Sequence, residues 1–168
     1  KVFFPCSELY RLSQPTTMAT HSIYIFFGLI ASGKSTLAEH FAIQQGWSYY
    51  NTDRVRKDLV GVVATERCSA DMGQGIYSPQ YTKKTYQAML DRAEQDIQQG
   101  LTGVVLDGSY SKQKDRGNAL ELVHNFEGKA LFVLCYCSEQ ETRRRLELRA
   151  QDPNAVSDGR WEIYLQQR

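Results

Sequence analysis

The order of the predicted elements indicates a three-layer α/β/α fold in which strands alternate with helices. Four apolar runs have the length of strands, at about residues 22–27, 47–51, 101–106 and 130–136. The first run is apolar on both faces, as is typical of a central parallel strand. Helical stretches separate the runs, so we expect right-handed crossovers between them. The sequence therefore predicts an α/β protein with a mainly parallel sheet of four to five strands.

The segment after the first strand carries the spacing G-x-x-x-x-G-K-[ST] without deviation. Gly28 and Gly33 permit backbone angles that other residues avoid, so successive N–H groups can turn inward on a phosphate. The helix that begins near Lys34 adds the positive end of its dipole. The candidate nucleotide-binding residues are Gly28, Ala31, Ser32, Gly33, Lys34, Ser35 and Thr36. A glycine-rich turn that binds nothing is the alternative, but the flanking strand and helix favour a P-loop NTPase fold.

The chemistry of this loop points to ATP as a phosphoryl donor, with Mg²⁺ as its cofactor. Lys34 can reach the terminal phosphates and is a candidate catalytic residue, and the Ser35 hydroxyl can ligate Mg²⁺. Asp107 follows the apolar run at 101–106 and is a second candidate metal ligand, acting through water, or a residue that orients the nucleophile. A turn aspartate before Gly108 is the alternative.

Asp53 and Arg56 follow the second strand, at the same edge of the sheet as the glycine-rich loop. Ligands of open α/β sheets bind beyond the carboxyl ends of the strands. A carboxylate there can accept the proton of an attacking hydroxyl, and Arg56 presents a cation one helical turn further on. Asp53 is thus a candidate catalytic base, and both residues are candidate substrate contacts. The alternative is that Thr52 or Asp53 only caps the helix that begins there.

Arg145 and Arg149 lie on the helix after the fourth strand, which begins with the capping box at residues 138–141. Their i, i+4 spacing places them on one side, where two guanidinium groups can bracket phosphates. Both are candidate catalytic residues that stabilise charge on a transferring phosphoryl group. A solvated arginine face is the alternative. The sequence leaves open which arginines contact the nucleotide among Arg116, Arg143, Arg144, Arg145 and Arg149.

Residues 61–78 show little periodicity, so we expect irregular structure over the site there. Ser78 and Pro79 have the character of a helix cap and a first-turn residue. Tyr77 and Tyr81 are candidates to line a substrate cleft, with simple packing as the alternative. We take Tyr81 as the predicted substrate contact.

Apolar positions at helical spacing predict the buried side of each helix. The predicted buried residues are Leu37, Ala38, Phe41 and Ala42; then Tyr86, Met89, Leu90, Ala93 and Ile97; then Ala119, Leu120, Leu122, Val123 and Phe126. Ser157 is expected to cap a last helix that carries Trp161, Tyr164 and Leu165 on one face.

The chain has 168 residues, a length typical of one domain with a sizeable core. Its net charge of +1 gives no general attraction to nucleic acid or to an anionic membrane. The cysteines lack metal-site spacing, and Cys135 and Cys137 are expected to face one side of the fourth strand, reduced and buried. No apolar run approaches the roughly 18 residues that cross a bilayer. We expect a cytoplasmic protein without a membrane partner.

Together the motifs resemble the small P-loop kinases of the zeta-toxin and polynucleotide-kinase-like group, also described as AAA-domain kinases. The matching features are the loop 28–36, Asp53-x-x-Arg56, Asp107 with Arg116 downstream, Arg145-x-x-x-Arg149 and Ser157-Asp158. The resemblance covers about residues 22–168. It implies a P-loop kinase domain at 21–168, preceded by an N-terminal extension of uncertain origin at 1–20.

The resemblance also implies an activity, the transfer of the ATP γ-phosphate to a hydroxyl. The loop would hold ATP and Mg²⁺, and Asp53 would be the general base. Arg56 would contact an acidic part of the acceptor, while Arg145 and Arg149 would stabilise the phosphoryl group. We expect a small or medium hydroxyl-bearing acceptor. A polynucleotide 5′-hydroxyl kinase is an alternative that the charge balance disfavours, and a nucleotide-binding regulatory module with little turnover is another.

Overall fold

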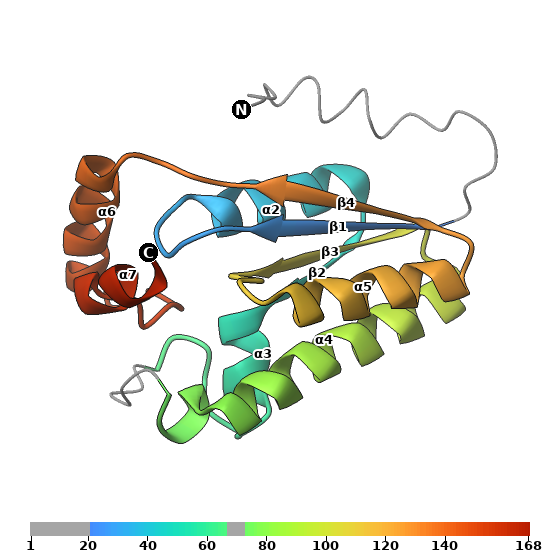
Figure 1. Ribbon diagram of the computed structural model, residues 1–168, viewed down its shortest axis with the longest axis horizontal. Coiled ribbons are helices and arrows are strands. Elements are labelled where there is room, and N and C mark those ends of the chain that lie inside the picture. Colours follow the sequence, from blue (N-terminus) through green and yellow to red (C-terminus); the bar gives the residue numbers. More distant parts are fainter. Residues whose placement is uncertain (1–20, 67–72) are drawn as a thin grey trace.

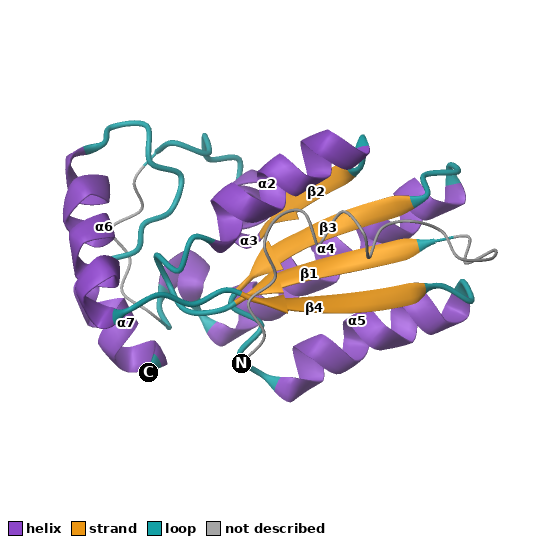
Figure 2. Cartoon of the chain, turned by 90° about the horizontal axis from the view of Figure 1, so that it is seen from above, coloured by secondary structure: helices purple, strands orange, loops and turns teal. Residues whose placement is uncertain are grey.

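The computed structural model describes residues 21–66 and 73–168, which form a three-layer α/β/α structure (Figure 1). Its sheet has four parallel strands in the order β2-β3-β1-β4, seen from above in Figure 2. The strands are β1 (Ser22–Phe27), β2 (Ser48–Asn51), β3 (Gly103–Gly108) and β4 (Lys129–Leu134). The fold class predicted from the sequence is thus confirmed. The N-terminal extension, Cys6 and Cys68 lie outside the described residues.

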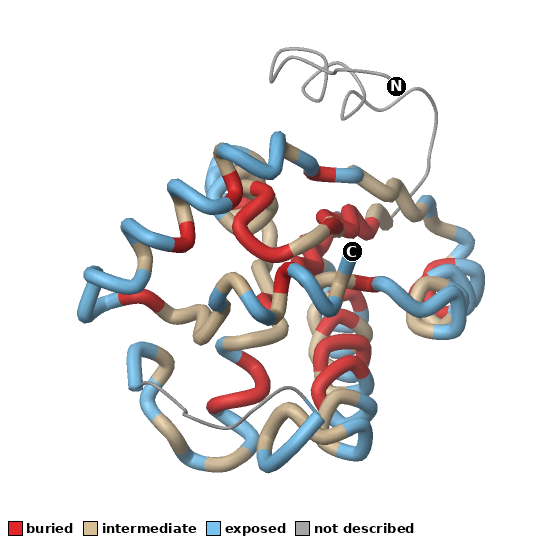
Figure 3. Tube along the Cα trace, turned by 60° about the vertical axis from the view of Figure 1, so that its left-hand side comes forward, coloured by how far each residue is buried: buried red, intermediate tan, exposed pale blue. Residues whose placement is uncertain are grey.

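Helices cover both faces of the sheet because alternate residues of β1 point to opposite sides. Tyr24 and Phe26 pack against α2 (Lys34–Gln45), whereas Ile23 and Ile25 pack against the layer of α4 (Pro79–Gln98) and α5 (Gln113–Asn125). Figure 3 marks the buried positions along the central strands and along one side of α4. The two faces of β1 are therefore both core, as expected of a central strand.

The remaining helices lie at the carboxyl ends of the strands (Figure 1). They are α3 (Thr52–Asp58), the 3₁₀ turn η1 (Gly75–Tyr77), α6 (Glu139–Gln151) and α7 (Trp161–Gln167). This end of the sheet is where the glycine-rich loop also lies. The described helices include none that is both long and apolar enough to cross a membrane.

Several predicted boundaries are wrong, and strand pairing explains two of them. β3 continues through Asp107, because that residue pairs in register with Phe26 of β1. Asp107 is consequently a strand residue and not a turn residue. β4 ends at Leu134, so Cys135 and Cys137 follow the strand instead of sharing one of its faces. Cys135 is nonetheless buried, and burial raises the pKa of its thiol to about 11.

The last helix and one predicted buried position, Leu120, also differ from expectation. α7 begins at Trp161 with Arg160 as its N-cap, so Ser157 does not cap it. Leu120 and Leu165 are more than half exposed, at 51% and 54%.

Candidate functional site

A cavity of about 360 Å³ opens at the carboxyl ends of the strands. Its walls come from segments that are distant in sequence: the P-loop (residues 28–36), α3, the start of α4, the loop after β3, α6, and α7 with the segment before it. Such a position is the usual ligand site of an open α/β sheet. Of the residues predicted from separate strand ends, the cavity is lined by Lys34, Ser35, Asp53, Arg56 and Arg149, but not by Asp107 or Arg145.

The P-loop has the backbone that its glycines permit. Gly28 and Gly33 have φ of 144° and 92°, and Ala31 has φ of 58°. A Cβ on Gly28 would lie 2.1 Å from the carbonyl oxygen of Cys135, so no larger residue fits. Gly33 caps α2 without any side-chain hydrogen bond, which leaves the first N–H groups of the helix available to an anion. Lys34 lines the cavity, and its Nζ donates to the Leu29 carbonyl at 3.3 Å.

Asp107 is completely buried beneath the cavity. Its Oδ2 accepts hydrogen bonds from the Asn51 amide and from the Tyr49 hydroxyl, the latter at 2.8 Å. Burial, and then the Asp107 charge, raise the pKa of Tyr49, so this hydroxyl remains a donor. The Oδ1 of Asp107 has no hydrogen-bond partner among the described residues. A buried oxygen without a partner and the Ser35 hydroxyl at the cavity are the hard donors that Mg²⁺ prefers, so the residues fit this ion.

The residue that caps α3 determines whether the Asp53 side chain is available to the cavity. The Asn51 side chain accepts from the backbone N–H groups of Asp53 and Arg54, at 3.0 and 3.1 Å. Asn51 is therefore the cap, and the alternative in which Thr52 or Asp53 caps the helix is wrong. The carboxylate of Asp53 lines the cavity instead, together with Thr52.

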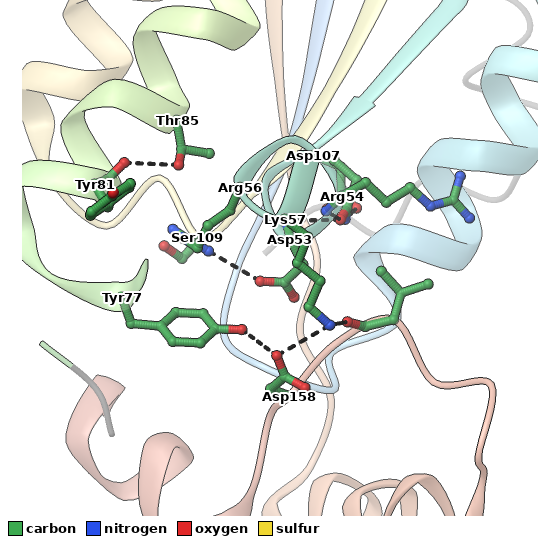
Figure 4. Close-up of polar contacts among 12 residues, drawn as sticks. Asp53, Arg54, Arg56, Lys57, Tyr77, Tyr81, Thr85, Asp107, Ser109 and Asp158 are labelled. Carbon is green, nitrogen blue, oxygen red and sulfur yellow. Dashed lines mark hydrogen bonds and ion pairs between the residues drawn. The ribbon is translucent and has the colours of Figure 1, made fainter. Parts of the chain in front are cut away.

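Arg56 is buried beside Asp53, with 8% of its side chain exposed. Its Nη1 lies 3.2 Å from Oδ1 of Asp53 (Figure 4). The guanidinium carbon is 4.8 Å from the centre of the Tyr77 ring. Its Nε has no hydrogen-bond partner among the described residues. Arg56 thus brings an incompletely satisfied cation to the cavity wall.

The structure separates the roles of Arg145 and Arg149. Arg145 donates from Nη1 to the carbonyl of Ala31 at 3.1 Å and from Nε to Glu141 at 2.7 Å, so it lies against the P-loop. Arg149 lines the cavity. Burial lowers the pKa of Arg149, an effect that the Asp53 charge opposes. Their neighbour Arg144 pairs with Glu141, and Arg143 stacks on Trp161.

Of the two tyrosines that are candidates to line a substrate cleft, Tyr77 lines the cavity and Tyr81 does not. The backbone N–H of Tyr81 bonds to the Ser78 hydroxyl, and its carbonyl accepts from Thr85 at 2.8 Å (Figure 4). Its ring lies under Lys84. Tyr81 therefore has a packing and capping environment. The 3₁₀ turn η1, which the sequence pattern does not reveal, is what directs Tyr77 inward.

The loop after β3 forms a polar wall that the sequence reasoning missed. Ser109, Ser111 and Lys112 line the cavity. Tyr110 between them has φ of 43°, and its N–H donates to the Tyr86 hydroxyl at 3.0 Å. Arg116 donates to the carbonyls of Tyr110 and Ser111, at 2.6 and 3.1 Å, so its described contacts are with this loop. These residues directly follow a strand end, and that position is the feature of the sequence that could have identified them as part of the site.

Comparisons with known proteins agree with this geometry. Residues 23–168 match a family model described as an AAA domain. No curated protein sequence matches the chain. A candidate kinase from Chloroflexus aurantiacus J-10-fl is similar in structure, with a TM-score of 0.67 and 15% identity over 90% of this chain and 77% of that one.

Two further solved structures share the fold at low identity. A gluconokinase from Sinorhizobium meliloti 1021 has a TM-score of 0.54 and 19% identity, over 90% of this chain and 76% of its own. A chain of the Pnkp1/Rnl/Hen1 RNA repair complex has a TM-score of 0.64 and 18% identity, over 90% of this chain but 45% of its own. The fold is thus that of P-loop kinases, and by the match over residues 23–168 the chain belongs to the AAA domain family.

Proposed function

We propose that the chain is an ATP-dependent phosphotransferase that transfers the γ-phosphate of ATP to a hydroxyl of an acceptor. The observation that carries the proposal is that Asp53 lines the same cavity as Lys34, because Asn51 caps α3 in its place. A phosphate-binding loop alone indicates only nucleotide binding. A carboxylate beside it supplies the group that an attacking hydroxyl needs.

The donor half of the reaction is assigned to the P-loop and α6. Lys34 and the N–H groups at the start of α2 bind the phosphates. Arg149 contacts the transferring phosphoryl group from the cavity wall. Arg145 stabilises the P-loop through its hydrogen bond to the Ala31 carbonyl. Ser35 and Asp107 would hold Mg²⁺, which when bound neutralises charge on the β- and γ-phosphates.

The acceptor half is assigned to α3 and the wall opposite the P-loop. Asp53 accepts the proton of the hydroxyl as its oxygen bonds to the γ-phosphorus. The bond from that phosphorus to the β,γ-bridging oxygen breaks, and ADP leaves. Arg56 is proposed to bind an anionic group of the acceptor, since its buried Nε lacks a partner among the described residues. We favour a small or medium acceptor over a polynucleotide.

An acceptor screen with γ-labelled ATP tests this proposal, with 5′-hydroxyl oligonucleotides included in the panel. Asp53→Asn should lower kcat about 100-fold or more while leaving the Kd of AMPPNP unchanged, because the base acts on the acceptor. Asp58→Asn is the matched control on the same helix, since the Asp58 side chain is 64% exposed.

Two results would contradict the proposal in different ways. An equal loss of kcat and AMPPNP affinity in Asp53→Asn, or no loss of either, would remove the base assignment. Tight AMPPNP binding by the wild type without transfer to any member of the panel would favour a nucleotide-binding regulatory module.

A further inference from the structure

Lys57 is a lysine whose side chain has no exposed surface. It lies on α3, directly after Arg56, but does not line the cavity. Its Nζ donates to the carbonyls of Ala64 at 3.0 Å and Val156 at 2.8 Å. The same Nζ lies 3.2 Å from Oδ2 of Asp158. A buried ammonium is retained in a fold only where paired and hydrogen-bonded in this way, so these contacts define a built site.

Asp158 connects Lys57 to the acceptor wall, the part of the cavity lining that Asp53, Arg56 and Tyr77 form. The Tyr77 hydroxyl donates to the same Oδ2 of Asp158 at 2.6 Å (Figure 4). Burial, followed by the nearby carboxylates, raises the pKa of Tyr77, so this hydroxyl remains protonated and keeps the hydrogen bond. With its hydroxyl engaged, Tyr77 presents its ring to the Arg56 guanidinium, 4.8 Å away.

The segment that carries Asp158 also contacts the P-loop. A Cβ on Gly159 would lie 1.7 Å from Cδ1 of Ile30, so the glycine allows a close approach. The backbone N–H of Ile30 donates to the side chain of Gln167 at 3.0 Å. The end of the chain before and along α7 is thus packed between the donor loop and α3.

We propose that Lys57 is a positioning residue for the acceptor wall. Through Asp158 it holds the Tyr77 ring and the Arg56 guanidinium in place beside Asp53, so that the wall is formed before an acceptor arrives. The effect of this arrangement on phosphoryl transfer rests on the proposed function. The wall presents an aromatic ring next to a cation, which suits an acceptor with an anionic group beside an apolar face.

The test uses variants that separate positioning from folding. The single variant Lys57→Met leaves the Asp158 carboxylate without its cation, and it can therefore fail to fold. The double variant Lys57→Met/Asp158→Leu removes both charges, and Tyr77→Phe removes only the hydroxyl. Lys83→Met is the matched control, because Lys83 is exposed on α4.

Amide hydrogen exchange of the unliganded protein gives the first measurement. The double variant and Tyr77→Phe should lose protection across residues 73–82, at least about tenfold in exchange rate, which corresponds to about 1.4 kcal/mol. The P-loop at residues 28–36 should exchange as in the wild type. Unchanged protection at 73–82 in the folded double variant would overturn the proposal.

Steady-state kinetics with the acceptor found by the screen give the second measurement. The acceptor KM should rise at least about tenfold in the double variant, with the Kd of AMPPNP unchanged, because the wall binds acceptor and not donor. An increase in the Kd of AMPPNP with an unchanged acceptor KM would also overturn the proposal. If the wild type transfers phosphate to no acceptor, the proposed function fails. The exchange measurement still decides whether the Lys57–Asp158 pair positions Tyr77.

Discussion

Asn51 shows how a single side chain serves the fold and the site together. Its oxygen caps α3, and its amide nitrogen donates to the buried carboxylate of Asp107. One residue at the end of β2 therefore holds the candidate metal ligand in place and leaves Asp53 directed at the cavity. Asp53 has about the same propensity for the cap as Asn51, and Thr52 a somewhat lower one, so propensity alone does not select Asn51 over Asp53.

At this scale we predict that Asn51→Ala lowers the free energy of unfolding by about 1–3 kcal/mol, through the lost cap and the less satisfied Asp107. Urea unfolding followed by circular dichroism measures the change. Asn154→Ala is the control, because Asn154 lies exposed in the loop after α6. A loss no larger than that of the control would show that another group caps α3.

At the scale of the element, α6 is stabilised by charges near its first turn. Glu141 accepts hydrogen bonds from Arg144 and Arg145, which lower its pKa from 4.5 to about 2. A carboxyl with a lowered pKa in the folded state stabilises that state above its unfolded pKa. That contribution disappears as the pH falls from about 4.5 towards 2.

Glu141→Gln should therefore lower the Tm at pH 7 and should match the wild type more closely as the pH falls below about 4.5. Differential scanning calorimetry across this range tests the prediction. Because 31% of the Glu141 side chain is exposed, solvent and salt screen its ion pairs. The effect at pH 7 should therefore be small and should weaken at high salt. A Tm difference that stays constant down to pH 3 would contradict this account of the ion pairs.

The elements themselves were largely predictable from the sequence, and the exceptions have a common cause. The bounds of β1 and the start of α2 agree with those inferred from the apolar run and the glycine-rich spacing. The end of β3 was wrong because pairing with β1, which is not local, carries the strand past Asp107. Lys57 was missed for the same reason, since its partner Val156 lies 99 residues away in the chain. A lysine in the polar last turn of a short helix is otherwise typical of a solvated face.

At the scale of the whole molecule, the cavity joins the start of the described chain to its end. The P-loop follows the first strand, and Asp158, Gly159 and Gln167 come from the last segment. A ligand that bridges such distant parts stabilises the fold as one unit. Binding should consequently be visible as a change in the stability of the whole chain.

We predict that AMPPNP with Mg²⁺, at 100 times its Kd, raises the stability of the wild type by about 2.7 kcal/mol. Gly28→Ala should abolish this increase, because its Cβ would collide with the Cys135 carbonyl and distort the P-loop. Thermal shift measurements with and without ligand test both points. Gly117→Ala is the control, since a Cβ at Gly117 meets nothing within 4 Å. The same ligand-induced shift in Gly28→Ala and Gly117→Ala would refute the role of the P-loop in binding.

The wall after β3 has a thermodynamic consequence for any acceptor. Arg116 and the Tyr86 hydroxyl hold the backbone of Tyr110 at φ of 43° in the unliganded protein. The conformational entropy of this loop is therefore lost when the protein folds and not when a ligand binds. A ligand that meets Ser109 and Ser111 orders little chain there, so more of its interaction energy remains as affinity.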